Sequence, residues 1–312
     1  MPTLYHQNGP SVANEMLKVK LLVRYQARIV AKGYVQIFGK DFTETFAPTI
    51  CPATLQILLT LAASKGHKMI IEQADVKNAY LNAFLDKDKI IYLALPPYYK
   101  LFHTIPTKLA KSDKCIVLCL HHPLYGMKQG THHWYQELKR ILMSLRFQVS
   151  QANEATFYHV KGEKFVIIAA ATDDFTIIAD SHESSHQIKK EMGKFFELVD
   201  LGSINWLLGI SVIRDIKNWT IALSQESYID QILTEFHLDK ARTTTTPMEP
   251  KADFTLDSPS VSPNLLSLSE KTIYQEMIGS LMYLSTMTWP DITYAVTIPI
   301  SGLTPYYPPR CS

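Results

Sequence analysis

Two adjacent aspartates, Asp173 and Asp174, interrupt an apolar stretch of the chain. Residues 165–171 before them and residues 175–178 after them have the composition of β-strands. Short apolar runs bounded by polar residues are typical of buried strands, so the pattern predicts a hairpin over about 164–180. Its tip carries two carboxylates whose mutual repulsion a divalent cation or a basic partner would relieve.

A third carboxylate follows the same pattern. The strand-like run over 69–76 places Asp75 near its end. Three carboxylates on two strand ends predict a site for two Mg²⁺ ions, the arrangement that polymerases use for phosphoryl transfer.

The four cysteines do not form a disulfide framework, and a reducing compartment is expected for a chain of this size without a secretory signal. Cys115 and Cys119 lie near several histidines, which raises the alternative of a zinc site. Their spacing is not that of a zinc finger, and the run from Cys115 to Cys119 has the pattern of a strand. We therefore favour the strand over the zinc site.

The totals fit an ordinary globular chain of 312 residues, 46% hydrophobic and 19% charged, with a net charge of +2. A net charge this small is only weak evidence that the protein binds nucleic acid. A basic cluster near the N-terminus could serve a phosphate backbone or be a solvated face; it consists of Lys18, Lys20, Arg24, Arg28 and Lys32. No apolar run reaches the ~20 residues of a membrane span, so a soluble protein is expected.

The elements that must position the carboxylates mix helices and hairpins irregularly, which favours an α+β fold. Helices are predicted over 52–65, 131–145, 184–198, 224–236 and 273–284, the last of the chain. Apolar faces are expected on the first, at Leu55, Leu58, Leu59 and Ala62, and on the second, at Trp134, Leu138, Ile141 and Leu142. Strands are predicted over 69–76, 90–95 and 115–120, in the 164–180 hairpin, and in a second hairpin of 206–212 with 219–224. Residues 19–35 read as two further strands, and 243–269 as a linker rich in Ser, Thr and Pro.

The order of motifs resembles the reverse transcriptase of copia-type LTR retrotransposons over about 22–296. The matching stretches are 25–34 (YQARIVAKGY), 41–48 (DFTETFAP), 73–82 (QADVKNAYLN), 124–129 (LYGMKQ), 134–135 (WY), 200–202 (DLG), 207–210 (LLGI), 223–225 (LSQ), 228–229 (YI), 279–284 (GSLMYL) and 290–292 (PDI).

The resemblance implies a right-hand polymerase fold of fingers, palm and thumb, with an antiparallel palm sheet flanked by helices. It divides the chain into a loose segment (1–17), fingers and palm (18–215), a thumb or connection-like region (216–296) and a divergent tail (297–312). It also implies that Asp75, Asp173 and Asp174, with the backbone carbonyl of Val76, bind two Mg²⁺ ions, Mn²⁺ being an alternative.

Further site residues follow from the resemblance. Tyr80 lies where the family has an aromatic steric gate against a ribose 2′-hydroxyl; without the resemblance it reads as a core aromatic. Arg28 and Lys32 are candidates for gripping the triphosphate, and Gln129 for positioning the nucleotide. Trp206 could pack under the primer strand or fill the palm–thumb seam, and we favour the seam.

The chain departs from the family close to this chemistry. Ala171-Thr172 stands where the family usually has Tyr-Val, and Gly130-Thr131-His132-His133 where it usually has Ala-Pro-Arg-Ala. Gln26 and Trp289 replace a lysine and an arginine. A segment at 130–133 that positions the nucleotide less closely would lower the catalytic rate. The tail after Val296 reads like translation past a frameshift or a truncation.

Two functions therefore stay open. The first is an RNA-directed DNA polymerase that takes dNTPs and an RNA or DNA template with its primer. The second is a decayed or co-opted fragment that folds and binds nucleic acid without polymerising. The family implies a cytoplasmic virus-like particle or the nucleus, and other Pol segments as partners. No RNase H, protease or integrase region is recognisable in this sequence.

Overall fold

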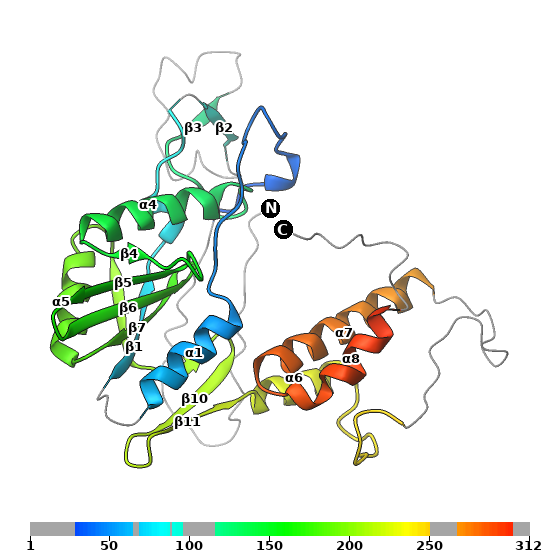
Figure 1. Ribbon diagram of the computed structural model, residues 1–312. Coiled ribbons are helices and arrows are strands. Elements are labelled where there is room, and N and C mark those ends of the chain that lie inside the picture. The colour runs from blue at the N-terminus through cyan, green and yellow to red at the C-terminus, as the bar shows by residue number, and fades with distance from the viewer. Residues whose placement is uncertain (1–28, 65–68, 88, 96–115, 250–266, 302–312) are drawn as a thin grey trace, which may run out of the picture. The chain divides into compact units, whose positions relative to one another are not determined.

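The computed structural model describes residues 29–64, 69–87, 89–95, 116–249 and 267–301 (Figure 1). Arg28 and the basic positions before it therefore lie outside the described residues, as do Cys115, Cys311 and most of the predicted linker. The chain divides into two compact units, Met1–Ile50 with Glu72–Gly202, and Cys51–Ile71 with Ser203–Ser312.

A six-stranded sheet forms the centre of the first unit (Figure 1). Its strand order is β4-β5-β6-β7-β1-β8, and the pairs β4·β5, β5·β6 and β6·β7 are antiparallel. The strands are β4 (Gln148–Val149), β5 (Thr156–Lys161), β6 (Lys164–Ala171), β7 (Asp174–Ala179), β1 (Ile70–Val76) and β8 (Leu198–Ser203). The predicted α+β class with antiparallel sheets is confirmed.

The middle of this sheet is buried, which explains why β6 and β7 read as continuous apolar runs. Ile168, Ile177 and Ile178 are fully buried. Helices α4 (Gly130–Ser144) and α5 (His182–Met192) pack along the sheet. Helix α4 buries the predicted face of Trp134, Leu138, Ile141 and Leu142.

Short elements complete the first unit. They are η1 (Gly33–Val35), η2 (Ala79–Asn82) and the antiparallel pair β2 (Ile91–Ala94) with β3 (Val117–Leu120). The described part of the predicted 19–35 strands, residues 29–35, contains only the single turn η1, so that part of the prediction is wrong. The amides of Val35 and Gln36 bond within this turn, to the carbonyls of Lys32 and Gly33, instead of to a neighbouring strand.

The second unit combines helices with a three-stranded sheet of order β11-β10-β9. Its elements are α1 (Pro52–Ala63), β9 (Trp206–Leu207), β10 (Ile210–Asp215), β11 (Thr220–Ser224), α6 (Glu226–Glu235), α7 (Leu268–Met287), η3 (Pro290–Ile292) and α8 (Thr293–Ser301). Cys51 caps α1 by accepting a hydrogen bond from the Thr54 amide.

Apart from residues 29–35, the predicted elements are present, with three differences. Strands β4, β5 and β8 were not predicted, because β5 is polar at one end and β8 is largely accessible. Helix α5 ends at Met192, so Phe195 lies beyond it and is 45% exposed. Helix α7 is not the last helix, since α8 follows it. Within the described residues, no helix is both long and apolar enough to cross a membrane.

Candidate active site

The two aspartates lie at the tip of the β6–β7 hairpin, as predicted. Ala171 pairs with Asp174, which leaves Thr172 and Asp173 as a two-residue loop. Thr172 adopts φ 61°, a left-handed conformation that is strained for a β-branched residue. Such a conformation persists only where the surroundings hold it.

Helix α4 supplies that support. The indole Nε1 of Trp134 donates a 2.8 Å hydrogen bond to the carbonyl of Thr172. Trp134 is 1% exposed, and its ring meets Phe196 edge to face at 5.6 Å. The sequence predicted that Trp134 is buried, but it gave no indication of this bond, because the hairpin is 38 residues away.

Strand β1 brings Asp75 to the same place. It neighbours β7 in the sheet, and the amide of Val76 donates a 3.0 Å hydrogen bond to the carbonyl of Asp173. The pKa of Asp174 is raised, first because surrounding protein displaces water from its carboxylate, and then because of the negative charges of Asp75 and Asp173. The charges of Asp75 and Asp173 therefore disfavour ionisation of Asp174.

The donor chemistry of these residues fits a hard divalent cation, since carboxylate oxygens are the preferred ligands of Mg²⁺. Among the described residues, however, no three His, Cys, Asp or Glu side chains are gathered closely enough to hold an ion. The side chain of Asp173 turns instead toward Tyr125, whose hydroxyl donates to its Oδ2 at 3.4 Å. Of the cysteines in the alternative zinc site, Cys119 is exposed and Cys115 lies outside the described residues, so that alternative is not tested.

Tyr80 lies beside this group on η2. After β1 the chain turns at Asn78, which has φ 52°, and the next turn carries Tyr80. Its hydroxyl is 3.1 Å from Oγ1 of Thr131, and its ring lies 4.5 Å from the ring of Tyr125. The structure therefore brings together Asp75, Asp173, Asp174 and Tyr80. It adds Tyr125, for which the sequence predicted no role in the site.

Gln129 is buried, with 2% of its surface exposed. Its amide nitrogen donates to the carbonyl of Asp41 at 3.2 Å, and its amide oxygen accepts from Gln36 at 3.0 Å. These two bonds link the Gln129 side chain to the segment from Gln36 to Asp41. The role of Gln129 in positioning a nucleotide stays a prediction. Lys32 is exposed at the start of η1, where it is accessible to an anion.

The loop with Lys32 touches the loop with Tyr125 backbone to backbone. The amide of Ala31 donates to the carbonyl of Tyr125 at 2.8 Å. A Cβ on Gly33 would lie 1.9 Å from the carbonyl oxygen of Gly126, so neither loop could approach so closely with a larger residue there.

The departing segment 130–133 has taken on new contacts. Nδ1 of His132 donates to the carbonyl of Phe46 at 2.6 Å. Burial lowers the pKa of His133, although Asp86, 4.0 Å away, opposes that shift. The arginine that the family usually has here is thus replaced by His132, whose side chain bonds to a neighbouring loop.

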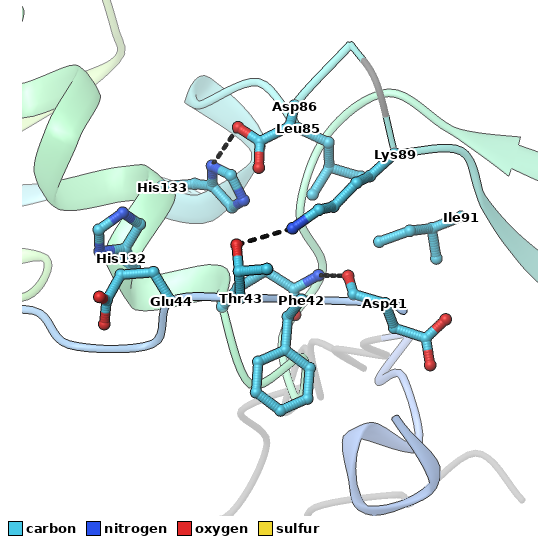
Figure 2. A pocket seen from close by; sticks show the side chains of 11 residues that line it. Asp41, Phe42, Thr43, Glu44, Leu85, Asp86, Lys89, Ile91, His132 and His133 are labelled. Carbon is cyan, nitrogen blue, oxygen red and sulfur yellow. Dashed lines mark hydrogen bonds and ion pairs between the residues drawn. The ribbon is translucent and has the colours of Figure 1, made fainter. Parts of the chain in front are cut away.

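These histidines help line a pocket of about 140 Å³ (Figure 2). The other lining residues are Asp41, Phe42, Thr43, Glu44, Leu85, Asp86, Lys89, Ile91 and Gln129. Several of its polar groups already bond within the protein; for example, Lys89 donates to Thr43 at 2.7 Å. None of the three aspartates lines this pocket.

Comparison with known proteins gives a consistent result. Residues 13–250 match the family described as reverse transcriptase (RNA-dependent DNA polymerase). The chain is similar to the retrovirus-related Pol polyprotein from transposon TNT 1-94 of Nicotiana tabacum, 30% identical over 89% of this chain and 20% of the relative. It is 33% identical to the Pol polyprotein from transposon RE1 of Arabidopsis thaliana, over 88% of this chain and 17% of the relative.

The chain therefore spans about a fifth of the length of these plant relatives. A putative transposon Ty5-1 protein of Saccharomyces cerevisiae is 26% identical over 72% of this chain and 67% of the relative. Among solved structures, a telomerase from Candida albicans in complex with a fragment of telomeric RNA covers 62% of this chain and 40% of its own. Its TM-score of 0.28 at 9% identity is too low to bear on the fold.

Proposed function

Because this chain belongs to the reverse transcriptase (RNA-dependent DNA polymerase) family, and its relatives are Pol polyproteins of copia-type retrotransposons, we propose that it extends a primer with deoxynucleotides along an RNA or DNA template. The observation that carries this proposal is that β1 and the β6–β7 hairpin are neighbours in one sheet, where the amide of Val76 bonds to the carbonyl of Asp173 and the ends of the strands bring Asp75 beside Asp173 and Asp174. Repulsion among three carboxylates is costly without a cationic ligand, and nucleotidyl transfer needs one.

Asp75, Asp173 and Asp174, with the backbone carbonyl of Val76, would hold two Mg²⁺ ions or Mn²⁺. Bound divalent ions lower the pKa of a primer 3′-hydroxyl and neutralise charge on the triphosphate. The tip of the hairpin would position the primer end, because the strained loop at Thr172 is fixed by Trp134 and by β1.

Other residues of the chain would select and hold the nucleotide. The ring of Tyr80 would exclude a ribose 2′-hydroxyl. The exposed Lys32 would bind the triphosphate, together with Arg28, which lies outside the described residues. The six-stranded sheet with α4 and α5 would serve as the palm of a right-hand polymerase, and the fingers, palm and thumb boundaries stay predictions.

A second function is favoured by a specific observation. Segment 130–133, where the family usually has an arginine, instead makes contacts within the protein through His132. A chain altered in this way could retain the fold and bind a template without polymerising. Localisation in a virus-like particle and association with other Pol segments apply equally to both functions.

A primer-extension assay distinguishes an active polymerase from a fragment that only binds nucleic acid. The chain is incubated with an RNA template, a DNA primer and dNTPs in Mg²⁺ and in Mn²⁺, beside an Asp75→Asn variant. Extension by the parent that is lost in the variant supports the polymerase. A folded parent that binds template–primer in a mobility assay but does not extend it supports the binding remnant and overturns the first proposal.

A further inference from the structure

Tyr80 is contacted from two sides by residues of different segments. Its hydroxyl is 3.1 Å from Oγ1 of Thr131, the second residue of α4. Its ring lies 4.5 Å from that of Tyr125, at an interplanar angle of 46°, and Tyr125 belongs to the loop before α4. A polar contact at the tip and a ring contact at the side together leave the aromatic ring little freedom.

The first of these contacts depends on a residue that departs from the family motif. The proline that the motif usually has at this position carries no hydroxyl, whereas Thr131 does. The change at 130–131 therefore does more than loosen the segment, because it adds a polar contact to the end of the Tyr80 side chain. Gly130 packs beside the same ring, since a Cβ there would lie 3.7 Å from Cδ2 of Tyr80.

The second contact continues toward the carboxylates. The hydroxyl of Tyr125 donates to Oδ2 of Asp173 at 3.4 Å. That distance is long for an O–H···O hydrogen bond, for which about 2.7–2.8 Å is usual, so this bond is weak. Thr131, Tyr80, Tyr125 and Asp173 thus form one chain of neighbours within the first unit.

We propose that Thr131 and Tyr125 are positioning residues that clamp the ring of Tyr80 beside Asp173, and that the hydroxyl of Thr131 thereby sets how strictly the enzyme rejects ribonucleotides. The proposal rests on the proposed polymerase function and extends it to two residues that make no direct contact with the reacting atoms. A ring that excludes a single hydroxyl must be held closely, because a displacement of about 1 Å is enough to change a rate by roughly a hundredfold.

The test compares matched variants in the full chain. Thr131→Val keeps the branched shape and removes the hydroxyl, whereas Thr131→Ser keeps the hydroxyl. For each, kcat/KM is measured for a dNTP and for the corresponding rNTP. We expect Thr131→Val to lower the dNTP preference about fivefold, the size of one neutral hydrogen bond, and Thr131→Ser to retain it. Equal preference in parent and Thr131→Val overturns the role of the hydroxyl.

Tyr125 is tested in parallel. Tyr125→Leu removes the ring and should lower the same preference, whereas Tyr92→Phe, at a tyrosine 62% exposed on β2, should leave it unchanged. A merely structural defect would lower kcat/KM for both nucleotides equally. Loss of rate at constant preference in Tyr125→Leu therefore contradicts the clamp.

A second readout does not need activity. With 3-fluorotyrosine placed at position 80, the ¹⁹F resonance should shift or broaden in Thr131→Val and match the parent in Thr131→Ser. An unchanged resonance in Thr131→Val overturns the clamp. Failure of the parent in primer extension, by contrast, overturns the polymerase function and the role in selection, while the resonance still decides whether Thr131 holds the ring.

Discussion

The indole of Trp134 holds the carbonyl of Thr172, the residue directly before Asp173, with a hydrogen bond of 2.8 Å. We expect Trp134→Phe to lower the free energy of unfolding by about 1–3 kcal/mol, because it leaves the partly buried carbonyl of Thr172 without its donor. Released strain at Thr172 should also displace the hairpin tip, so primer extension should fall. Urea unfolding and extension assays would measure the two effects. Trp289→Phe, at a tryptophan that is 46% exposed, is the control and should change stability little.

Asp174 should make the protein less stable as the pH rises. Its pKa is raised above the ordinary 3.8 by displaced water and by Asp75 and Asp173. A carboxyl with a raised folded-state pKa stabilises the fold below its unfolded pKa, and that contribution is lost as the pH rises through the folded pKa. Asp174→Asn should therefore raise Tm at pH 7, and its advantage should disappear below about pH 3.8. Thermal scans across this range would measure it.

The matched control is Asp230→Asn at an exposed position of α6, which should give no such pH-dependent gain. The same scans with added Mg²⁺ test metal binding at the hairpin. Mg²⁺ should raise Tm of the parent more than that of Asp173→Asn, because the variant lacks one ligand. An equal response in parent and Asp173→Asn would reject the proposed metal site.

Glu72 on β1 and the buried Lys189 on α5 form an ion pair at 2.7 Å. Burial opposes ionisation of Glu72, but hydrogen bonds from Lys189, Ser185 and His182 outweigh it and lower its pKa to about 2. This lowered pKa corresponds to about 3 kcal/mol of stability above pH 4.5, lost as the pH falls from 4.5 toward 2. Glu72→Gln should lose this amount at pH 7 in urea unfolding.

Glu163→Gln, at an exposed turn between β5 and β6, is the control and should unfold like the parent. The pH dependence adds a second criterion. The gap between Glu72→Gln and the parent should narrow steadily in acid, since the parent loses its ion pair there. A gap that stays constant down to pH 2 would show that Glu72 acts through packing rather than charge.

Two glycines close to each other in sequence should respond oppositely to alanine. Gly126 has φ +87°, and a Cβ there would lie 2.3 Å from the carbonyl oxygen of Ala31. Gly126→Ala should therefore destabilise the protein by more than about 1 kcal/mol. Gly130 begins α4, and a Cβ there would meet nothing closer than 3.5 Å, so Gly130→Ala should stabilise by about 0.5–1 kcal/mol. Equal changes in Tm for the two variants would contradict this.

The sequence predicted the elements that bury a regular apolar face. Helices α1 and α4 appear with the expected buried residues, and the β6–β7 hairpin carries its aspartates at the tip. These patterns are local, because the period of a helix or strand fixes which side chains face the core. Strands β5 and β8 were missed, since their polar or accessible positions give no such alternation.

The residue types and their order, by themselves, determined the α+β class, the family, and three carboxylates on two strand ends. Only the tertiary structure decided what supports them, because hydrogen bonds between distant segments leave no periodic signal in a sequence. Trp134 contacts Thr172 across 38 residues, and Tyr80 contacts Thr131 across 51. The same physics placed Gln129 between two loops and gave Thr131 a partner, since most polar groups that packing removes from water form a hydrogen bond inside the protein.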